Sequence, residues 1–320
     1  MNPPFTVTPA ALQSLSRIER LIGRIEGLNQ PKPQPRLRRS SRVRTVQGSL
    51  AIEGNTLTLD QVTALIEGRR VIAAKKDIRE VLNAIEVYDG MNRLNPFSKR
   101  DLLKTHKNMM AGLIKSAGRW RGSGVGILKG NALSHVAPPA ERVPYLINEL
   151  FGFLSDQTHP LLIRASVFHY ELEFIHPFED GNGRLGRFWH TLLLTTHHEV
   201  FQYIPVESLI RNHQTDYYAA LEASDRQGEA TPFIETSLAI IAQAFTEFMG
   251  DLKPEPLTPN ARLRIAAGHF GKQCFSRKAY LNHFKTLSTA TASRDLRDGV
   301  KQGLLTKQGS GAQTTYQFTT

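Results

Sequence analysis

Apolar residues recur at helical spacing along most of this chain. After Thr8 and Pro9, which are typical of a helix cap and a first helical position, one apolar face extends to about Leu28; its members are Leu12, Leu15, Ile18, Ile22 and Ile25. A similar face is formed by Ile78, Val81, Leu82, Ile85 and Tyr88. The pattern predicts a mainly α-helical bundle.

Capping signals and further apolar runs add helices to this bundle. Thr58 with Gln61 predicts a capping box that opens a helix through Ile66, and Ser98 with Asp101 predicts another through about Leu113. Further helices are predicted over residues 141–154, 161–174 and 206–223, and from about residue 183 onward.

Glycines interrupt the helical pattern between residues 120 and 139. The segment 125–131 suits a strand followed by a turn, so residues 124–136 are predicted to form a short β-hairpin. An exposed hairpin edge can bind an extended peptide through its backbone. The sequence is compatible with a peptide-binding flap formed by this hairpin and also with an ordinary surface hairpin.

Twelve residues, 176–187, form a loop between two predicted helices and carry the chemistry of the chain. Pro177 disfavours the α conformation at His176 and ends the first helix, while Gly181 and Gly183 permit a tight loop. The second helix begins at about Gly183 or Arg184. Its free N–H groups and positive dipole end then face the loop, as a phosphate site requires.

The side chains of this loop suit nucleotide chemistry. Arg184 and Arg187 lie three residues apart and are predicted to clamp phosphates from one helix face. Asp180 is a hard oxygen ligand for Mg²⁺, and His176 is the near-neutral base that accepts a proton from an attacking hydroxyl.

The segment from His176 to Arg187, His-Pro-Phe-Glu-Asp-Gly-Asn-Gly-Arg-Leu-Gly-Arg, resembles the Fic family signature HxFx(D/E)GNGRxxR at every fixed position. The resemblance implies transfer of AMP from ATP to a Ser, Thr or Tyr hydroxyl of a target protein. It implies that His176 is the catalytic base, that Asp180 holds Mg²⁺, and that Phe178 anchors the loop. The nucleotide is then bound by Gly181, Asn182, Gly183, Arg184, Gly186 and Arg187.

The resemblance extends to two segments outside the loop. Ser49 and Glu53, followed by Gly54, resemble the inhibitory motif (S/T)xxxE(G/N) of some Fic proteins, in which the glutamate pairs with the last arginine of the signature, here Arg187. A carboxylate there competes with phosphate for one guanidinium. By the same resemblance, residues 218–225 border the adenosine. Tyr218 is the expected contact, although family members often have asparagine at the position of Asp225.

Composition indicates a large core and two domains. The chain has 320 residues, of which 40% are hydrophobic and 22% charged. The amino-terminal residues do not resemble a signal peptide, and no membrane-spanning run is present. With Cys274 as its single cysteine, the chain is predicted to be a cytoplasmic protein without a membrane partner or a disulfide.

Positive charge is concentrated at the carboxy-terminal end. Residues 260–320 contain ten lysine and arginine residues and two aspartates, so they carry +8 of the net +11. We predict a Fic catalytic domain over residues 1–252, a proline-rich linker over 253–259, and a winged helix-turn-helix over 260–320. The surplus charge makes DNA a candidate partner of the last domain. Residues 30–44 are predicted to be a solvated basic linker.

The resemblance therefore implies a protein adenylyltransferase that is restrained in cis by Glu53. Removal of AMP from a modified protein at the same site, use of a different nucleotide donor, and a DNA-binding regulator with a Fic sensor domain remain open. The chain itself is a candidate substrate by self-modification. The target protein, the trigger that releases Glu53 and an oligomeric state are not specified by the sequence.

Overall fold

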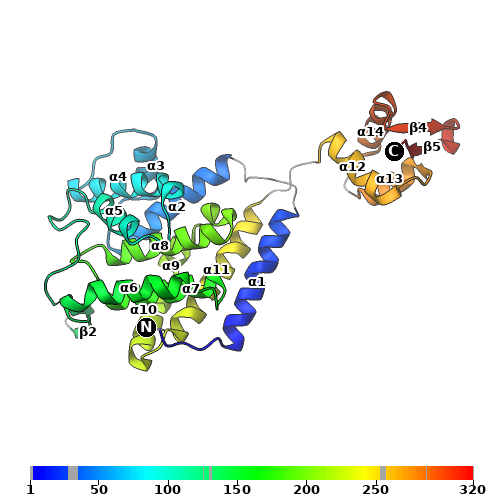
Figure 1. Ribbon diagram of the computed structural model, residues 1–320. Coiled ribbons are helices and arrows are strands. Elements are labelled where there is room, and N and C mark those ends of the chain that lie inside the picture. The colour runs from blue at the N-terminus through cyan, green and yellow to red at the C-terminus, as the bar shows by residue number, and fades with distance from the viewer. Residues whose placement is uncertain are drawn as a thin grey trace. The chain divides into compact units, whose positions relative to one another are not determined.

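The protein consists of two compact units, Met1–Lys253 and Pro254–Thr320. The computed structural model describes residues 3–27, 35–124, 126–129, 132–252, 257–285 and 287–319. Both units are built mostly from helices (Figure 1), so the mainly α fold class predicted from the sequence is confirmed. Within the described ranges, no helix is both long and apolar enough to span a bilayer.

The first unit is a helical bundle with one hairpin. Its α-helices are α1 (Pro9–Glu26), α2 (Pro35–Ile52), α3 (Leu59–Ile66), α4 (Lys75–Asp89), α5 (Lys99–Met109), α6 (Val143–Ser155), α7 (Leu161–Ile175), α8 (Asn182–His197), α9 (Val206–Asn212), α10 (Gln214–Gln227) and α11 (Thr231–Asp251). Short 3₁₀ helices connect them at η1 (Met91–Arg93), η2 (Ala140–Arg142) and η3 (Glu199–Tyr203).

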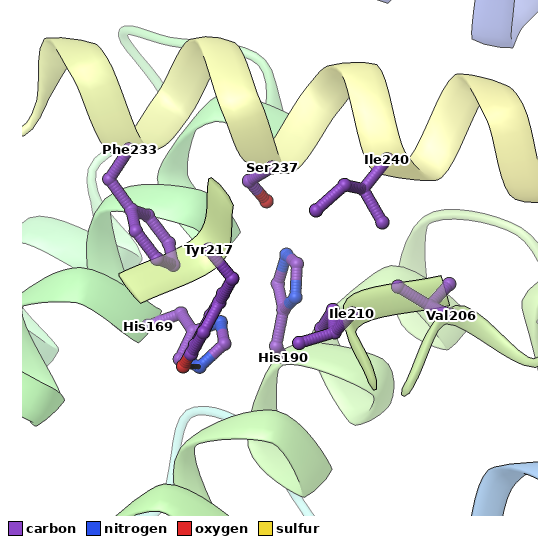
Figure 2. A pocket seen from close by; sticks show the side chains of 8 residues that line it. All are labelled: His169, His190, Val206, Ile210, Tyr217, Phe233, Ser237 and Ile240. Carbon is purple, nitrogen blue, oxygen red and sulfur yellow. Dashed lines mark hydrogen bonds between the residues drawn. The ribbon is translucent and has the colours of Figure 1, made fainter. Parts of the chain in front are cut away.

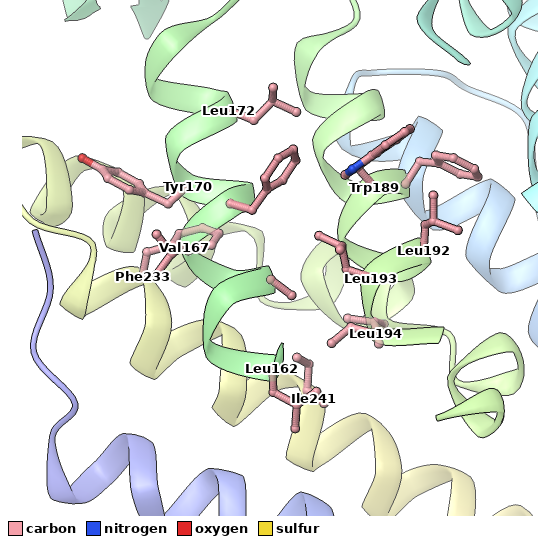
Figure 3. Close-up of a cluster of buried hydrophobic side chains, with 14 of the residues drawn as sticks. Leu162, Val167, Tyr170, Leu172, Trp189, Leu192, Leu193, Leu194, Phe233 and Ile241 are labelled. Carbon is pink, nitrogen blue, oxygen red and sulfur yellow. The ribbon is translucent and has the colours of Figure 1, made fainter. Parts of the chain in front are cut away.

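Helices α7 and α8 form the centre of this bundle. Both are buried nearly all round, as expected of helices in the middle of a core. Figure 3 shows Leu172 of α7 and Leu193 of α8 pointing into the space between the two helices. Trp189, also on α8, is fully buried and donates its indole N–H to the Pro96 carbonyl oxygen at 3.1 Å. This packing fixes the ends of both helices, and therefore the loop between them.

Helix α2 corrects the prediction of a linker over residues 30–44. Residues 30–34 lie outside the described ranges, but a helix begins at Pro35, in the first-turn position that proline tolerates. Val43, Val46 and Leu50 are buried against α3 and α4. The basic residues before them suggested a solvated segment, yet this one apolar stripe is enough to dock the helix.

Several predicted boundaries and faces also differ from the structure. Leu12 and Leu82 were expected in the core but are 52% and 41% exposed, because smaller or neighbouring residues such as Ala11 and Val81 face inward. The helix opened by Ser98 ends at Met109, before the predicted Leu113. The helix predicted over residues 206–223 is two helices, α9 and α10, which are separated at His213.

The predicted hairpin is present. Strands β1 (Gly126–Lys129) and β2 (Ala132–Val136) pair in antiparallel register, with Gly126 opposite Val136 and a bulge between Ile127 and Leu128. The turn at residues 130 and 131 lies outside the described residues. A bulge increases the local twist of a hairpin. Here the strands remain paired on both sides of the bulge.

The second unit has its own small core. Its elements in order are α12 (Pro259–Phe270), β3 (Phe275–Ser276), α13 (Arg277–His283), α14 (Thr289–Lys301), β4 (Leu305–Gln308), η4 (Gly311–Gln313) and β5 (Thr315–Phe318). The strands form an antiparallel sheet in the order β3-β5-β4. Leu263, Ala292 and Leu296 are buried together under this sheet. Ser288 caps α14 as predicted, and its hydroxyl accepts from Thr291 N at 3.2 Å.

The contact between α2 and α9 generates a stability prediction. A Cβ added at Gly48 would lie 2.8 Å from the Ser208 backbone nitrogen and 2.9 Å from its Cα atom, so the two helices would have to separate. Gly48→Ala is expected to lower the free energy of unfolding by about 1–3 kcal/mol, the usual cost of overpacking. Chemical denaturation measures this change.

The control is Gly23→Ala on the exposed side of α1, where an added Cβ meets no atom within 4 Å. Helix propensity predicts that this variant is more stable by up to about 1 kcal/mol. Equal effects of the two substitutions would contradict the close approach of α2 and α9.

Candidate active site

The loop between α7 and α8 depends on two residues with left-handed backbone conformation. His176 ends α7 with φ 49° and is the only non-glycine residue with positive φ among those described. Gly181 has φ 87° and precedes α8, and a Cβ there would lie 2.6 Å from the Met110 sulfur. A strained histidine at a helix end is a conformation that surrounding structure must enforce.

The side chains of His106 and Asn182 hold the loop in place through hydrogen bonds to its backbone. The His106 ring is fully buried and stacks on Phe178 with ring centres 3.6 Å apart. Its Nδ1 accepts from Gly118 N at 2.9 Å, so Nε2 donates to the Asp180 carbonyl oxygen, also at 2.9 Å. Burial lowers the pKa of His106 to about 4, which keeps it neutral in this role. The Asn182 side chain bonds both backbone groups of Phe178, at 2.9 and 3.0 Å.

Arg121 holds the loop from the side of the hairpin. Its buried guanidinium donates to the carbonyl oxygens of His176 at 2.8 Å and Ser123 at 2.7 Å, and also to that of Pro138. Its own backbone N–H donates to the Pro177 carbonyl oxygen at 2.9 Å. One side chain therefore ties the histidine to the two ends of the segment that carries β1 and β2.

The start of α8 is built as an anion site. The first intrahelical bond runs from Leu185 N to the Gly181 carbonyl oxygen at 3.0 Å. The N–H groups of Asn182, Gly183 and Arg184 precede it and therefore have no acceptor inside the helix. The Gly181 N–H is used by the Asp180 carboxylate at 2.6 Å. Both polar atoms of the Asn182 side chain are hydrogen-bonded to Phe178, so Asn182 can bind a ligand only through its backbone N–H.

Glu53 lies at this anion site. Its Oε1 atom accepts from Arg187 Nη2 at 2.7 Å, and a Cβ built on Gly183 would overlap that same oxygen. Ser49 completes the contact, because its carbonyl oxygen accepts from Arg187 Nη2 at 3.0 Å. Arg187 is 2% exposed. Burial alone would lower the pKa of Arg187, but the Glu53 carboxylate raises it above the ordinary value. The two residues that the sequence paired are therefore in contact.

Arg184 takes a different direction from Arg187. It is 4% exposed and donates to Glu80 of α4 at 3.1 Å and to Asp180 Oδ1 at 2.8 Å. Asn55 donates to the second Glu80 oxygen at 2.8 Å. The predicted clamp of two arginines on one helix face thus appears as two buried guanidiniums with separate carboxylate partners.

The Asp180 side chain fits the magnesium site expected from the sequence. It is 50% exposed beside the start of α8, and its Oδ2 atom accepts no hydrogen bond from a described residue. No cluster of three metal-binding side chains occurs in the described ranges. A single carboxylate is nevertheless sufficient, since Mg²⁺ is commonly bound by one or two carboxylates together with substrate phosphates and water.

Two predicted nucleotide contacts lie on different sides of the site. Gly186 faces α7, where a Cβ would lie 2.6 Å from Glu173 Oε1 and 3.1 Å from the His169 ring. Its glycine is therefore needed for helix packing. Tyr218 is 37% exposed, whereas its neighbour Tyr217 is buried. The Glu53 carboxylate contributes, after burial, to raising the pKa of Tyr218, so this ring lies on the Glu53 side of the loop.

Four residues that shape the site were not identified from the sequence: Glu80, His106, Arg121 and Glu173. Glu80 follows several charged residues at the start of α4, so its sequence position does not distinguish it. The others belong to segments that meet the loop only in the folded chain, and nothing in their local sequence marks them.

Asp225 also has a structural role that the sequence did not indicate. Its Oδ1 atom accepts from Tyr170 OH at 3.0 Å, which ties α10 to α7. Burial and then the nearby Asp225 raise the pKa of Glu171 to about 7.

Comparison with known proteins agrees with this geometry. A family model described as Fic/DOC family matches residues 96–194. Protein adenylyltransferase fic-1 of Caenorhabditis elegans is 29% identical over 221 residues, which cover 65% of this chain and 41% of the relative. Protein adenylyltransferase Fic of Nematostella vectensis is 26% identical over 265 residues, covering 73% and 59%. The chain thus spans about half the length of these relatives.

Solved structures extend the similarity to the second unit. The crystal structure of a Fic family protein from Desulfovibrio desulfuricans G20 is 38% identical with a TM-score of 0.76, and the match covers 100% of this chain and 98% of that one. Fic-1 (aa134–508) from C. elegans, at 24% identity and a TM-score of 0.60, shares the fold over 75% of this chain and 73% of its own. On the first of these matches, together with the loop between α7 and α8, the chain belongs to the Fic family.

Proposed function

We propose that this protein transfers AMP from ATP to a hydroxyl of a target protein and that Glu53 restrains the transfer in cis. One observation supports this most directly. The Glu53 carboxylate lies against Gly183 and Arg187, where the free N–H groups of a helix start and a guanidinium would otherwise bind phosphate. A site that attracts a carboxylate of the same chain is suited to a stronger anion.

Nucleotide binding would use the groups around the start of α8. The backbone N–H groups of Asn182, Gly183 and Arg184 donate hydrogen bonds to phosphate oxygens. The Arg187 guanidinium releases Glu53 and binds the terminal phosphate in its place. Tyr218 borders the adenosine at the partly exposed edge of α10. Mg²⁺, held at the Asp180 carboxylate, would supply positive charge to the phosphates. Fixed donors of this kind stabilise the charge that develops during phosphoryl chemistry.

His176 acts as the base in the transfer. Its ring takes the proton of a Ser, Thr or Tyr hydroxyl as that oxygen bonds to the α-phosphorus. The bond between the α-phosphorus and the bridging oxygen breaks, and pyrophosphate leaves with the electron pair. The left-handed backbone at His176, fixed by Arg121 at 2.8 Å, sets the direction of the ring. His176 Nδ1 also lies 3.4 Å from the Glu173 carbonyl oxygen.

The β1–β2 hairpin is the proposed docking edge for the target. Arg121 connects the segments on either side of the hairpin to the backbone of His176. A target strand paired with this hairpin would therefore be held at a fixed distance from the base. Backbone pairing tolerates many sequences, so residues near the acceptor hydroxyl would decide which target is modified.

A second candidate function is DNA binding by unit 2, which we propose is a winged helix. Its order of helices and strands and its three-stranded antiparallel sheet fit that fold. Asp295 is buried and neutralised by Arg262 at 2.5 Å, so it does not offset the surface charge. Arg294, Arg297 and Lys301 lie on the exposed side of α14. A basic helix face of this kind is suited to DNA phosphates.

Glu53→Gly should increase self-labelling with α-labelled ATP and tighten ATP binding. Loss of a charge-assisted hydrogen bond worth about 1.5–3 kcal/mol corresponds to roughly 10- to 100-fold in apparent affinity. Asp89→Gly is the matched control, since it removes an exposed carboxylate whose ion pair is with Arg42 of α2. No gain for Glu53→Gly, or an equal gain for the control, would contradict restraint by Glu53.

His176→Ala, made in the Glu53→Gly background, should reduce the labelling rate by about 10²- to 10⁴-fold, the usual contribution of a general base. ATP binding should be retained, because the phosphate-binding groups belong to α8. Calorimetry and labelling together separate the two effects. Retained labelling by the double variant would show that another group takes the proton.

Combined Arg294→Ala, Arg297→Ala and Lys301→Ala substitutions should weaken binding of duplex DNA by the full chain. They should also reduce the dependence of log affinity on log salt concentration by about 2–3, at about 0.9 per lost phosphate contact. The charge control is Arg20→Ala with Arg24→Ala on the exposed face of α1. Unchanged binding by the triple variant would exclude α14 as the DNA contact.

A further inference from the structure

A second glutamate lies near Arg187: Glu173 contacts α8 at Gly186, about one turn further along the helix than Gly183, which Glu53 contacts. Glu173 of α7 is 13% exposed in its side chain, and its Oε1 atom lies over Gly186. Among the described residues, this buried oxygen has no hydrogen-bond partner. Its nearest nitrogen in an ion-pair geometry, His169 Nε2, is 3.8 Å away, beyond hydrogen-bond reach. A buried carboxyl oxygen without a partner requires an explanation.

The neighbouring rings do not stabilise a charged Glu173. Figure 2 shows His169 beside Tyr217, and Tyr217 OH lies 3.2 Å from His169 Nε2, the atom that faces Glu173. Burial, followed by the proximity of His190 and Arg187, lowers the pKa of His169 far below its usual value. Burial lowers the pKa of His190 to about 3. Both histidines are therefore neutral and supply no positive charge on this side.

Charged and titratable groups face Glu173 from three further elements. Arg187 lies on α8, Glu53 follows α2, and Tyr217 and Tyr218 lie on α10. Burial raises the pKa of Glu173 to about 7, while Arg187 lowers it and Glu53 raises it again. Burial, then Glu173, raises the pKa of Tyr217, which stays neutral. Burial is thus the largest influence on the pKa of Glu173, and Arg187 and Glu53 shift that pKa in opposite directions.

Arg187 needs an anionic partner at all times because it is buried. Removing one partner of a buried ion pair is strongly destabilising, since it leaves an uncompensated charge in the interior. In the structure Glu53 supplies that partner. In the proposed reaction a phosphate supplies it. Between release of Glu53 and arrival of the nucleotide, the guanidinium would have neither.

We propose that Glu173 is the reserve counter-ion of Arg187. It is a neutral carboxylic acid while Glu53 or a phosphate pairs with the guanidinium, and it loses its proton to water when both are absent. The net charge around Arg187 is then conserved, since one carboxylate replaces another and one proton is released. Glu173 is a positioning residue in this account, because it keeps Arg187 ordered for the incoming phosphate. The inference rests on the proposed function for its purpose, but its charge exchange does not require nucleotide.

The exchange can be measured by infrared spectroscopy of the full chain without nucleotide. The carbonyl stretch of a protonated carboxylic acid is followed against pH in wild type, Glu53→Gly, Glu173→Gln and the double variant. Glu173→Gln should remove a band that titrates near neutral pH in wild type. In Glu53→Gly the midpoint of that band should shift to lower pH, because Arg187 then stabilises the ionised form. Asp89→Gly should leave the midpoint unchanged.

Addition of ATP with Mg²⁺ to Glu53→Gly should restore the band, and nucleotide binding should weaken several-fold as pH rises through neutrality. The Glu53→Gly, Glu173→Gln double variant should lose this pH dependence, apart from the titration of ATP itself, which both proteins share. If Glu173→Gln does not fold, Glu173→Asp should displace the band instead of removing it.

The same midpoint in wild type and Glu53→Gly, or the absence of a band that depends on residue 173, would overturn the exchange. Wild type and Glu53→Gly could both fail to bind ATP while the midpoint of the carboxylic acid band still differs between them. In that case the proposed function fails and the reserve counter-ion stands. If ATP binds and is used for labelling while the midpoint does not shift, the proposed function stands and the reserve counter-ion fails.

Discussion

The pairing of a carboxylate with the amino-terminal turn of α8 is the interaction on which the account of this protein depends. Helix starts and guanidiniums attract anions, and the chain places one of its own anions, Glu53, where both act together. A contact of this kind is stable in the absence of ligand and can be displaced by a stronger one. In the proposed function, this contact would restrain the site from within the first unit.

The rest of the first unit keeps this turn available. The loop before α8 could satisfy its own N–H groups by folding back, but its backbone is bound elsewhere by His106, Arg121 and Asn182. These three side chains are buried, and each of them bonds to the backbone of the loop. The left-handed conformation of His176 is maintained by the same contacts. Strain at the proposed base and open N–H groups in the next helix are consequences of one scaffold.

Sequence patterns were most informative where the chemistry is local. The loop 176–187, its helices and the caps at Thr58 and Ser288 could be predicted because spacing and capping residues act over a few positions. The partnership of Glu53 with Arg187 was accessible only through resemblance, since 134 residues separate them. Composition also predicted a linker where α2 begins, because its basic residues concealed a narrow apolar stripe.

Groups whose role depends on tertiary contact could not be predicted. Arg121 resembles any arginine of a glycine-rich segment until its carbonyl partners are seen. Gly186 was predicted to be a nucleotide contact within the family signature, and its packing role beside Glu173 and His169 is visible only in the structure. Glu80, which holds Arg184, lies 104 positions before it in the chain. In each case the residue type is ordinary, and its structural role arises from its buried position beside the loop.

In the proposed mechanism, one position at the start of α8 accepts either the Glu53 carboxylate or a phosphate. A crystal structure of the Glu53→Gly chain with a non-hydrolysable ATP analogue and Mg²⁺ tests it most directly. We expect a terminal phosphate oxygen within hydrogen-bond distance of Arg187 Nη2 and of the Gly183 N–H, in the place that Glu53 Oε1 occupies here. Phosphates bound away from α8, with Arg187 still turned toward Ser49, would contradict it.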